Sequence, residues 1–401
     1  MCCALDSGDA DHAGRQPSFN QPNRTTLMAV ISRGLEGIIA AETRIGDVRG
    51  QEGQLIYCGY DINELAGKVS YEEVVHLLWH NRLPTQHELD RLTTALRAER
   101  ELPQGVIEWI TSAPKTAAPI DIMRTAVSML GCYPTNRPNL DMPEANAIAI
   151  KLVAQIGIIA AYFHRSRSGL PLPAIRPDLS EAGHFLWLMT GEEPGVEATQ
   201  TLDVAYVLHA EHGFNASTFT GRVVSSTLSD MYSAVSAAIG ALKGPLHGGA
   251  NEGVIHMLQE IGSLDKVDGW IEEALAQKKK IMGIGHRVYK VLDPRAPHLK
   301  TMAIKLSEEL GDAQWIQMSE RIATIMKERK GLNANVDFYS ATVYYSLGIP
   351  TDLFTPIFAI SRMSGWTAHI LEQYADNRLF RPLSEYAGAP VGKKVVPIAE
   401  R

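Results

Sequence analysis

The stretch SYEEVVHLLWHN, residues 70–81, is the clearest evidence for the fold class of this chain. Its valines, leucines and tryptophan recur at the three- and four-residue spacing of one helix face. Ser70 is a typical N-cap residue, and Glu73 three positions later completes a capping box. The stretch therefore predicts an amphipathic helix over residues 71–81.

The same periodicity runs through most of the remaining chain. Further helices are predicted over residues 85–101, 147–163, 182–190, 199–212, 218–242, 267–280, 298–310 and 313–330. Strand signal is limited to residues 41–48 and 54–57, which are consistent with one small hairpin across 49–53. Neither regular strand–helix alternation nor an internal repeat is evident, so we predict an all-α fold.

Length and charge distribution predict two domains. A chain of 401 residues exceeds the usual single-domain size of roughly 100–200 residues. The balance of charged residues changes near residues 244–253 and again near 348–355. We therefore expect a small domain over 248–348, inserted into a large domain made of 28–247 and 349–401.

The remaining composition favours a cytoplasmic protein. Residues 1–27 are polar and acidic and lack the apolar core of a secretory signal, so we interpret them as a flexible tail. The apolar stretch 147–163 carries Lys151 and Gln155, which favours a buried core helix over a membrane span. The four cysteines include no C-x-x-C pair, as expected in a reducing compartment. A net charge of -7 argues against a nucleic-acid partner.

The first chemical motif is GPLHGGAN, residues 244–251, just before a helical pattern. Glycines let a ligand approach the backbone closely, and a helix N-terminus disfavours imidazolium. A neutral His247 in this place is able to donate a hydrogen bond to a developing enolate oxygen. The alternative is an ordinary loop histidine.

The second motif is GIGHRVYK, residues 283–290, which runs into DPR at 293–295. Val288 stands where a dinucleotide-binding loop has its third glycine, and no strand is predicted before the motif. A mobile anion-binding loop that uses His286, Arg287 and Lys290 fits better. The alternative is a solvated basic loop.

The third motif is NVDFYS, residues 335–340, in which Asp337 lies between Val336 and Phe338. Burial in such an apolar setting raises the pKa of a carboxyl group and makes the carboxylate a better proton acceptor. A helix N-cap role for Asp337 is an equally good explanation of the residue.

The fourth motif is an apolar helical run near the C-terminus that contains Arg362 and is followed by Arg381. A substrate carboxylate would pair with such an arginine bidentately, and a structural ion pair is the alternative.

His209 and His212 are three residues apart on a predicted helix and would share one face. No further ligands accompany them, so we expect no metal. We interpret His209 as a core residue and His212 as a substrate hydrogen-bond donor. Histidines, one carboxylate and several arginines together indicate proton abstraction beside a dianion site.

The four motifs together, in this order and at this spacing, resemble the citrate synthase family. The resemblance extends over nearly all of residues 34–388. It implies a large helical domain and a small one that closes over the substrate. It also implies a reaction in which acetyl-CoA and oxaloacetate give citrate and CoA, with acyl-CoA as co-substrate and no permanently bound cofactor. The same fold and catalytic set serve 2-methylcitrate synthase, which uses propionyl-CoA. A non-catalytic relative that binds CoA or a 2-oxo acid is a more distant alternative.

The resemblance also assigns the catalytic roles. His247 matches the histidine that donates a hydrogen bond to the thioester oxygen, and Asp337 matches the base that removes the methyl proton. His286 matches the histidine that polarises the keto group of oxaloacetate. His212 matches a further substrate-binding histidine.

Three arginines match the family's carboxylate ligands. Arg295 and Arg362 correspond to arginines of the same subunit, and Arg381 corresponds to one that the partner subunit provides. The resemblance therefore implies a homodimer. From charge alone, we expect Arg287 and Lys290 to contact the CoA phosphates.

Overall fold

The computed structural model describes residues 31–133 and 141–401. The chain divides into two compact units, residues 1–42 and 43–401. Within the first unit, the described part contains one short 3₁₀ turn, η1 (Arg33–Leu35). The predicted tail over 1–27 lies outside the described residues, as do Cys2 and Cys3.

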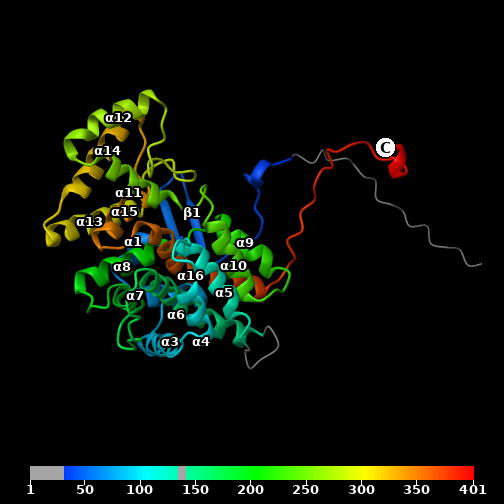
Figure 1. Cartoon of the computed structure of the whole chain (residues 1–401), viewed down its shortest axis with the longest axis horizontal. Helices are drawn as coiled ribbons and strands as arrows, with labels where there is room; N and C mark the ends of the chain where they lie inside the picture. Colours follow the sequence, from blue (N-terminus) through cyan, green and yellow to red (C-terminus); the bar gives the residue numbers. More distant parts are fainter. Residues whose placement is uncertain (1–30, 134–140) are drawn as a thin grey trace, which may run out of the picture. The chain divides into compact units, whose positions relative to one another are not determined.

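Helices make up most of the second unit, and this confirms the predicted fold class (Figure 1). The helices are α1 (Ile62–Leu65), α2 (Tyr71–His80), α3 (Gln86–Ala98), α4 (Gln104–Ser112), α5 (Pro119–Leu130), α6 (Met142–Arg167), α7 (Glu181–Thr190), α8 (Val196–His209), α9 (Ala216–Ser225), α10 (Met231–Leu242), α11 (Ala250–Ile261), α12 (Val267–Ala276), α13 (Ala296–Leu310), α14 (Gln314–Lys330), α15 (Val336–Ser346) and α16 (Phe354–Ala375). Short 3₁₀ turns are η2 (Leu264–Lys266), η3 (Thr351–Leu353) and η4 (Ile398–Glu400). In α2, the predicted capping box of Ser70 and Glu73 is present.

Three short strands form the sheet of this unit, in the order β1–β2–β3. They are β1 (Gly46–Arg49), β2 (Gln54–Tyr57) and β3 (Tyr60–Asp61). The antiparallel pairing of β1 with β2 confirms the predicted hairpin, although β1 begins at Gly46 and not at residue 41. The two-residue strand β3 was not predicted, because it is too short to show alternation.

Helix α16 lies at the centre of the large group of helices and packs against α2, α6, α8, α9 and α10. Every residue from Phe354 to Leu371 is buried. Gly365 permits the close approach of α8, because a Cβ atom there would lie 2.3 Å from the carbonyl oxygen of Ala210. The apolar helix with Arg362 is thus the core helix around which the candidate site is built.

Several predicted helices have other limits in the structure, and the helix predicted over 267–280, for example, ends at Ala276. The helix predicted over 199–212 ends at His209, where the Tyr57 hydroxyl lies 3.1 Å from the carbonyl oxygen of Val207 and accepts the N–H of Glu211 at 3.2 Å. Tertiary contacts thus replace the next helical hydrogen bonds. The helix predicted over 218–242 is two helices, α9 and α10, and Asp230 caps the second through the N–H of Ser233 at 2.9 Å.

Helices α11 to α15 lie within the residue range predicted for the small domain, and Figure 1 shows them as one group. Helix α15 packs against α11, α13 and α14, while α13 also packs against α8. The division at residues 248 and 348 stays a prediction, since residues 43–401 form one compact unit.

Helix α6 is the one described helix that is long and apolar enough to cross a membrane. Its most apolar window is 72% buried within the protein, as in the core helix that the sequence predicted. Helices α3, α4, α5, α7 and α16 pack around it.

Candidate active site

The three histidines of the predicted site each come from a different connecting segment. His212 follows the end of α8, His247 precedes α11, and His286 lies in the loop before α13. The rings of His212 and His286 are 5.7 Å apart between centroids. The ring of His247 is 6.4 Å from that of Phe358 on α16.

His286 is neutral and holds its proton on Nε2. The backbone N–H groups of Val288 and Tyr289 both lie 3.0 Å from His286 Nδ1. A backbone N–H only donates, so Nδ1 is the acceptor. Burial, and then the positive charge of Arg295, lowers the pKa of His286 to about 4. The Nε2–H is thus free to donate to a ligand.

His247 shows the opposite tautomer. Its Nε2 accepts the backbone N–H of Ser217 at 3.3 Å and lies 2.8 Å from the Ser217 hydroxyl. Trp366 on α16 donates to the same hydroxyl at 3.1 Å and fixes its position. Burial, and then the charge of Arg362, lowers the pKa of His247 to about 4. The free proton therefore lies on Nδ1.

His212 and His209 have different surroundings because α8 ends between them. The prediction that both lie on one helical face is wrong, since His212 follows the helix. His212 Nε2 lies 3.2 Å from the Tyr289 hydroxyl, and burial with Arg295 and Arg362 holds its pKa well below the usual value. His209 is fully buried with Nδ1 2.8 Å from the Ala205 carbonyl oxygen, as predicted for a core histidine.

Asp337 lies in the first turn of α15 and is not its N-cap. The N-cap is Asn335, whose side chain accepts the N–H of Asp337 at 3.0 Å. The capping alternative for Asp337 is therefore wrong. Burial raises the pKa of Asp337 to about 6, although Arg295 opposes the effect. The site thus contains a carboxylate whose basicity is suited to proton abstraction near neutral pH.

Asp293 and Asn335 join the segments that carry His286, Arg295 and Asp337. The Asp293 carboxylate accepts Nε and Nη2 of Arg295 at 2.9 and 2.8 Å and the N–H of Val336 at 3.2 Å. The Asn335 side chain donates to the Gly285 carbonyl oxygen at 2.8 Å. Because these contacts are buried, the loop and the start of α15 are held as one unit.

Arg362 is almost completely buried, with 1% of its surface exposed. Its Nε donates to the His209 carbonyl oxygen at 2.6 Å, but no described carboxylate pairs with it and its buried Nη2 has no partner. Burial lowers the pKa of Arg362 to about 10. The negative charge of Glu211 opposes this shift, although Glu211 does not form an ion pair with Arg362. A buried cation without a directly paired anion is costly, so an anionic ligand explains Arg362 better than the structural ion pair that was the alternative.

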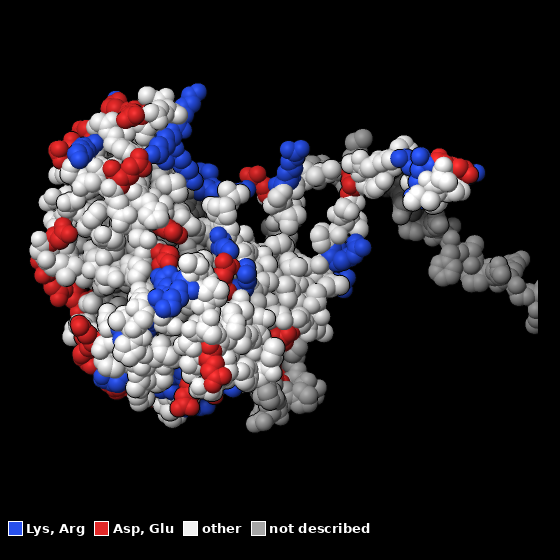
Figure 2. Space-filling model, viewed as in Figure 1, with Lys and Arg blue, Asp and Glu red and all other residues white. Residues whose placement is uncertain are grey.

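Three predicted site residues lie outside this cluster within the single chain. Arg381 is exposed and makes its described hydrogen bond to the neighbouring Pro382 carbonyl oxygen at 3.4 Å. Arg287 and Lys290 are exposed on the loop that carries His286. Figure 2 shows Lys and Arg side chains gathered near the region where Figure 1 places α12. In the sequence, the exposed residues Lys278, Lys279 and Lys280 follow α12.

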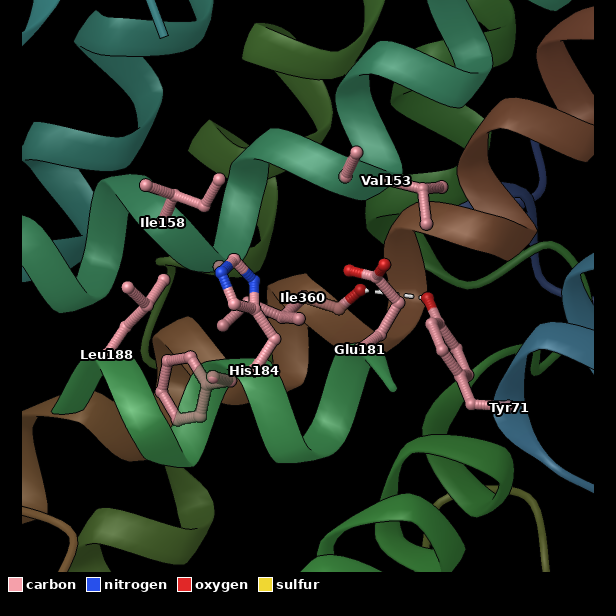
Figure 3. Close-up of a pocket in the computed structure, with 10 residues that line it drawn as sticks. Tyr71, Val153, Ile158, Glu181, His184, Leu188 and Ile360 are labelled. Carbon is pink, nitrogen blue, oxygen red and sulfur yellow. Dashed lines mark hydrogen bonds between the residues drawn. The ribbon is translucent and has the colours of Figure 1, made fainter. Parts of the chain in front are cut away.

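An internal cavity lies between α2, α6, α7 and α16, and none of the predicted site residues lines it (Figure 3). Glu181 and His184 face it beside Tyr71, whose hydroxyl donates to the Ile360 carbonyl oxygen. Its volume of about 10 Å³ suits a single water molecule. It is therefore too small for an organic substrate.

Among the residues that the structure describes, no three His, Cys, Asp or Glu side chains are arranged to hold a metal ion. Cys58 and Cys132 are free thiols, and neither touches the histidine cluster. The arrangement thus offers neutral hydrogen-bond donors, one base and two buried guanidinium groups.

The sequence did not point to several residues that build the site. Ser217 and Trp366 orient His247, and Tyr289 contacts His212. Tyr289 lies in the GIGHRVYK motif and Trp366 in the apolar helical run with Arg362, but no spacing rule gives either residue a partner. Ser217 lies in an Asn-Ala-Ser sequence whose only local signal is the N-cap Asn215.

Comparison with known proteins gives consistent results. A family model for the citrate synthase C-terminal domain matches residues 34–383. Citrate synthase 2 of Bacillus subtilis is 50% identical over 92% of this chain and 99% of its own length. The protein named 2-methylcitrate synthase 1 of Corynebacterium glutamicum is 42% identical over 92% and 98%.

A solved structure agrees with these sequence relatives. Citrate synthase of Thermoplasma acidophilum, in a ternary complex with carboxymethyl coenzyme A and oxaloacetate, superimposes with a TM-score of 0.86. The sequence identity is 34%, and the match covers 92% of this chain and 99% of that one. On the motifs, the fold and these relatives, the chain belongs to the citrate synthase family of condensing acyltransferases.

Proposed function

We propose that this chain is a citrate synthase, which joins the methyl carbon of acetyl-CoA to the keto carbon of oxaloacetate. The observation that carries the proposal is the set of neutral histidines and one basic carboxylate, together with the buried Arg362 that has no ion-pair partner. A dianionic substrate would provide the anion that this guanidinium lacks.

The first step is removal of a methyl proton from the thioester by the Asp337 carboxylate. The electron pair of the broken C–H bond moves into the thioester, so negative charge develops on the carbonyl oxygen. The Nδ1–H of His247 stabilises this oxygen by a hydrogen bond. Because its pKa is about 4, His247 is a neutral donor before the reaction begins.

The second step forms the new carbon–carbon bond. The enolate carbon attacks the keto carbon of oxaloacetate, whose oxygen takes the Nε2 proton of His286 and becomes a hydroxyl group. The proton that Asp337 gained in the first step balances this loss, and His286 recovers a proton before the next turnover. Water then breaks the C–S bond of the citryl thioester, which yields the third carboxylate of citrate and the thiol of CoA.

Arginines hold the carboxylates of oxaloacetate. Arg362 has an unpaired Nη2, and Arg295 is oriented by Asp293 through Nε and Nη2. We assign the remaining contact to Arg381 from the partner subunit of a homodimer. The exposure of Arg381 within one chain supports this assignment, as does the run of exposed apolar residues in its segment, Leu379, Leu383 and Tyr386.

The loop that carries His286 also provides the cations for acyl-CoA. Arg287 and Lys290 are exposed, and the Lys290 ammonium is oriented by the Arg287 carbonyl oxygen at 3.1 Å. Cations at the edge of the site attract the CoA phosphates.

A second candidate is 2-methylcitrate synthase, because relatives with that name match 92% of this chain at 42% identity. The mechanism would be the same, and only the acyl pocket would differ. One methylene group in such a pocket changes selectivity by about 1–3 kcal/mol, so the preference is graded.

The test is release of CoA thiol by the purified protein with oxaloacetate and either acetyl-CoA or propionyl-CoA. A larger kcat/KM for acetyl-CoA supports the citrate synthase assignment. A larger kcat/KM for propionyl-CoA would replace it by 2-methylcitrate synthase. No thiol release with either substrate would contradict both.

A further inference from the structure

The hairpin formed by β1 and β2, residues 46–57, carries none of the catalytic or substrate-binding residues assigned above. Its strands pair from Gly46 opposite Tyr57 to Arg49 opposite Gln54, and the turn closes with the Gly53 N–H on the Arg49 carbonyl oxygen at 2.9 Å. The hairpin nevertheless contacts two of the segments that carry site histidines.

One contact is with the turn that carries His212. The Tyr57 hydroxyl lies 2.9 Å from the Glu211 carbonyl oxygen and accepts the Glu211 N–H at 3.2 Å. Gly46 lies so close that a Cβ atom there would be 2.9 Å from Glu211 Cγ. The backbone next to His212 is therefore fixed by the two ends of the hairpin.

The other contact is with the loop that carries His286. The Lys290 N–H donates to the Gly50 carbonyl oxygen at 2.9 Å. A Cβ atom on Gly50 would lie 2.4 Å from the Val288 carbonyl oxygen, and one on Gly53 would lie 2.7 Å from Val291 Cγ2. The turn of the hairpin thus lies directly on residues 288–291.

This second contact matters because residues 286–292 contain no helix or strand. Their position depends on tertiary contacts on two sides. On one side, Gly285 and Asn333 are joined by a backbone hydrogen bond at 2.8 Å. On the other side lies the hairpin, so the hairpin helps to set how far His286 stands from His212.

We propose that the hairpin 46–57 is a positioning element that sets the spacing of His212 and His286 and thereby the affinity for oxaloacetate. The inference rests on the proposed function, since it assigns both histidines to that substrate. A displacement of about 1 Å in a substrate-positioning group lowers turnover by about a hundredfold in other enzymes.

The principal test is Gly50→Ala, with Gly269→Ala on α12 as the matched control. A Cβ atom on Gly269 would meet nothing within 4 Å, and neither glycine requires a left-handed backbone. Because the Gly50 contact is with backbone, the loop must move. We expect KM for oxaloacetate to rise by about ten- to a hundredfold in Gly50→Ala and kcat to fall as well, because His286 both binds the substrate and donates the proton. Gly269→Ala should leave both constants within about twofold.

A second measurement does not depend on turnover. Hydrogen exchange of the Lys290 amide should be faster in Gly50→Ala than in the wild type, because this amide bonds to Gly50. Val291→Ala, with the exposed Val196→Ala as control, provides a milder change should Gly50→Ala fail to fold. Val291 is 44% exposed and Val196 is 86% exposed, so both variants should fold. Val291→Ala should raise KM for oxaloacetate about threefold or more and speed exchange of the Lys290 amide.

The outcomes separate the two proposals. A wild type that releases no CoA thiol contradicts the proposed function, while amide exchange still reports on the hairpin contact. The hairpin inference would be overturned if the wild type is active and the folded Gly50→Ala variant keeps both the wild-type KM for oxaloacetate and the wild-type protection of the Lys290 amide. If Gly50→Ala does not fold, the same result with Val291→Ala would overturn it.

Discussion

Replacement of Arg362 by methionine distinguishes a substrate ligand from a structural ion pair. Arg362 is 1% exposed, and burial lowers its pKa from 12.5 to about 10. Each tenfold change in an acid constant corresponds to about 1.4 kcal/mol, so the charged form is disfavoured in the folded protein by roughly 3 kcal/mol. The penalty is fully present at pH 7, where the group is charged in both the folded and the unfolded chain.

Methionine removes this penalty and keeps part of the packing on Phe358, whose ring lies 4.8 Å from the guanidinium carbon. It also leaves the His209 carbonyl oxygen without its donor, at a cost of about 1–3 kcal/mol. The two effects oppose each other. The free energy of unfolding should therefore change by no more than about 2 kcal/mol.

The matched control is Arg222→Met. Arg222 is also buried, but it pairs with Glu372 at 2.6 Å and bonds to Gln373 at 2.9 Å. Removal of one member of a buried ion pair typically costs about 3–5 kcal/mol. Urea unfolding of both variants at one protein concentration measures the difference.

Activity should be affected more by Arg362→Met than by Arg222→Met, the reverse of the order expected for stability. Loss of a buried carboxylate partner costs about 2–5 kcal/mol of binding, so KM for oxaloacetate should rise from about 30-fold to several thousand-fold in Arg362→Met. Arg222→Met should leave KM much closer to the wild-type value when it is assayed below its unfolding transition. A destabilised Arg362→Met with an unchanged KM would refute the reasoning.

Three further predictions concern other parts of the site. Since burial raises the pKa of Asp337 to about 6, kcat/KM should fall as pH drops below about 6. Asp337→Asn should lower kcat by about 10²–10⁴-fold, and a wild-type rate would exclude the base role. The variant should lose no stability at pH 7, because the buried charge of Asp337 destabilises the folded protein at that pH. Ser217→Ala should lower kcat by about two- to tenfold through the lost hydrogen bond to His247, with Ser236→Ala on α10 as control, and an unchanged kcat would argue against orientation by Ser217. Arg381→Ala and Asp337→Asn proteins, each of low activity, should recover activity when their subunits are mixed and exchanged, and no recovery would contradict a site shared between subunits.

The helical periodicity of the sequence was sufficient for the fold class and for most helices. The capped helix α2 shows why, since Ser70 and Glu73 act locally and need no tertiary partner. The end of α8 is different. It depends on Tyr57, which is about 150 residues away and leaves no mark in the sequence around His212. The break between α9 and α10 was missed because residues 225–229, before the cap Asp230, contain neither glycine nor proline.

The candidate site was predictable as a set of residue types, but not as a set of interactions. Sequence alone left Asp337 open between base and N-cap, and the structure assigns the cap to Asn335. It also left Arg362 open between substrate and ion pair, and only burial without a carboxylate favours the substrate. The tautomers of His247 and His286 depend on backbone N–H groups that no motif displays.

The role proposed for the hairpin 46–57 could not be predicted from the sequence either. Its sequence gives a strand pattern and a turn but no chemistry, and its contacts with both histidine segments exist only in three dimensions. The glycine at position 50 is required because the Val288 carbonyl oxygen lies where its side chain would be.

The most direct test of the central claim uses acetyl-CoA whose methyl group carries three deuterium atoms, with oxaloacetate as acceptor. Enolisation by Asp337 followed by carbon–carbon bond formation removes one deuterium. Mass spectrometry should therefore find citrate that retains two deuterium atoms, and the product should be nearly absent with Asp337→Asn. Trideuterated acetate, formed at the same rate by both proteins, would mean that the thioester is only hydrolysed and would contradict the account.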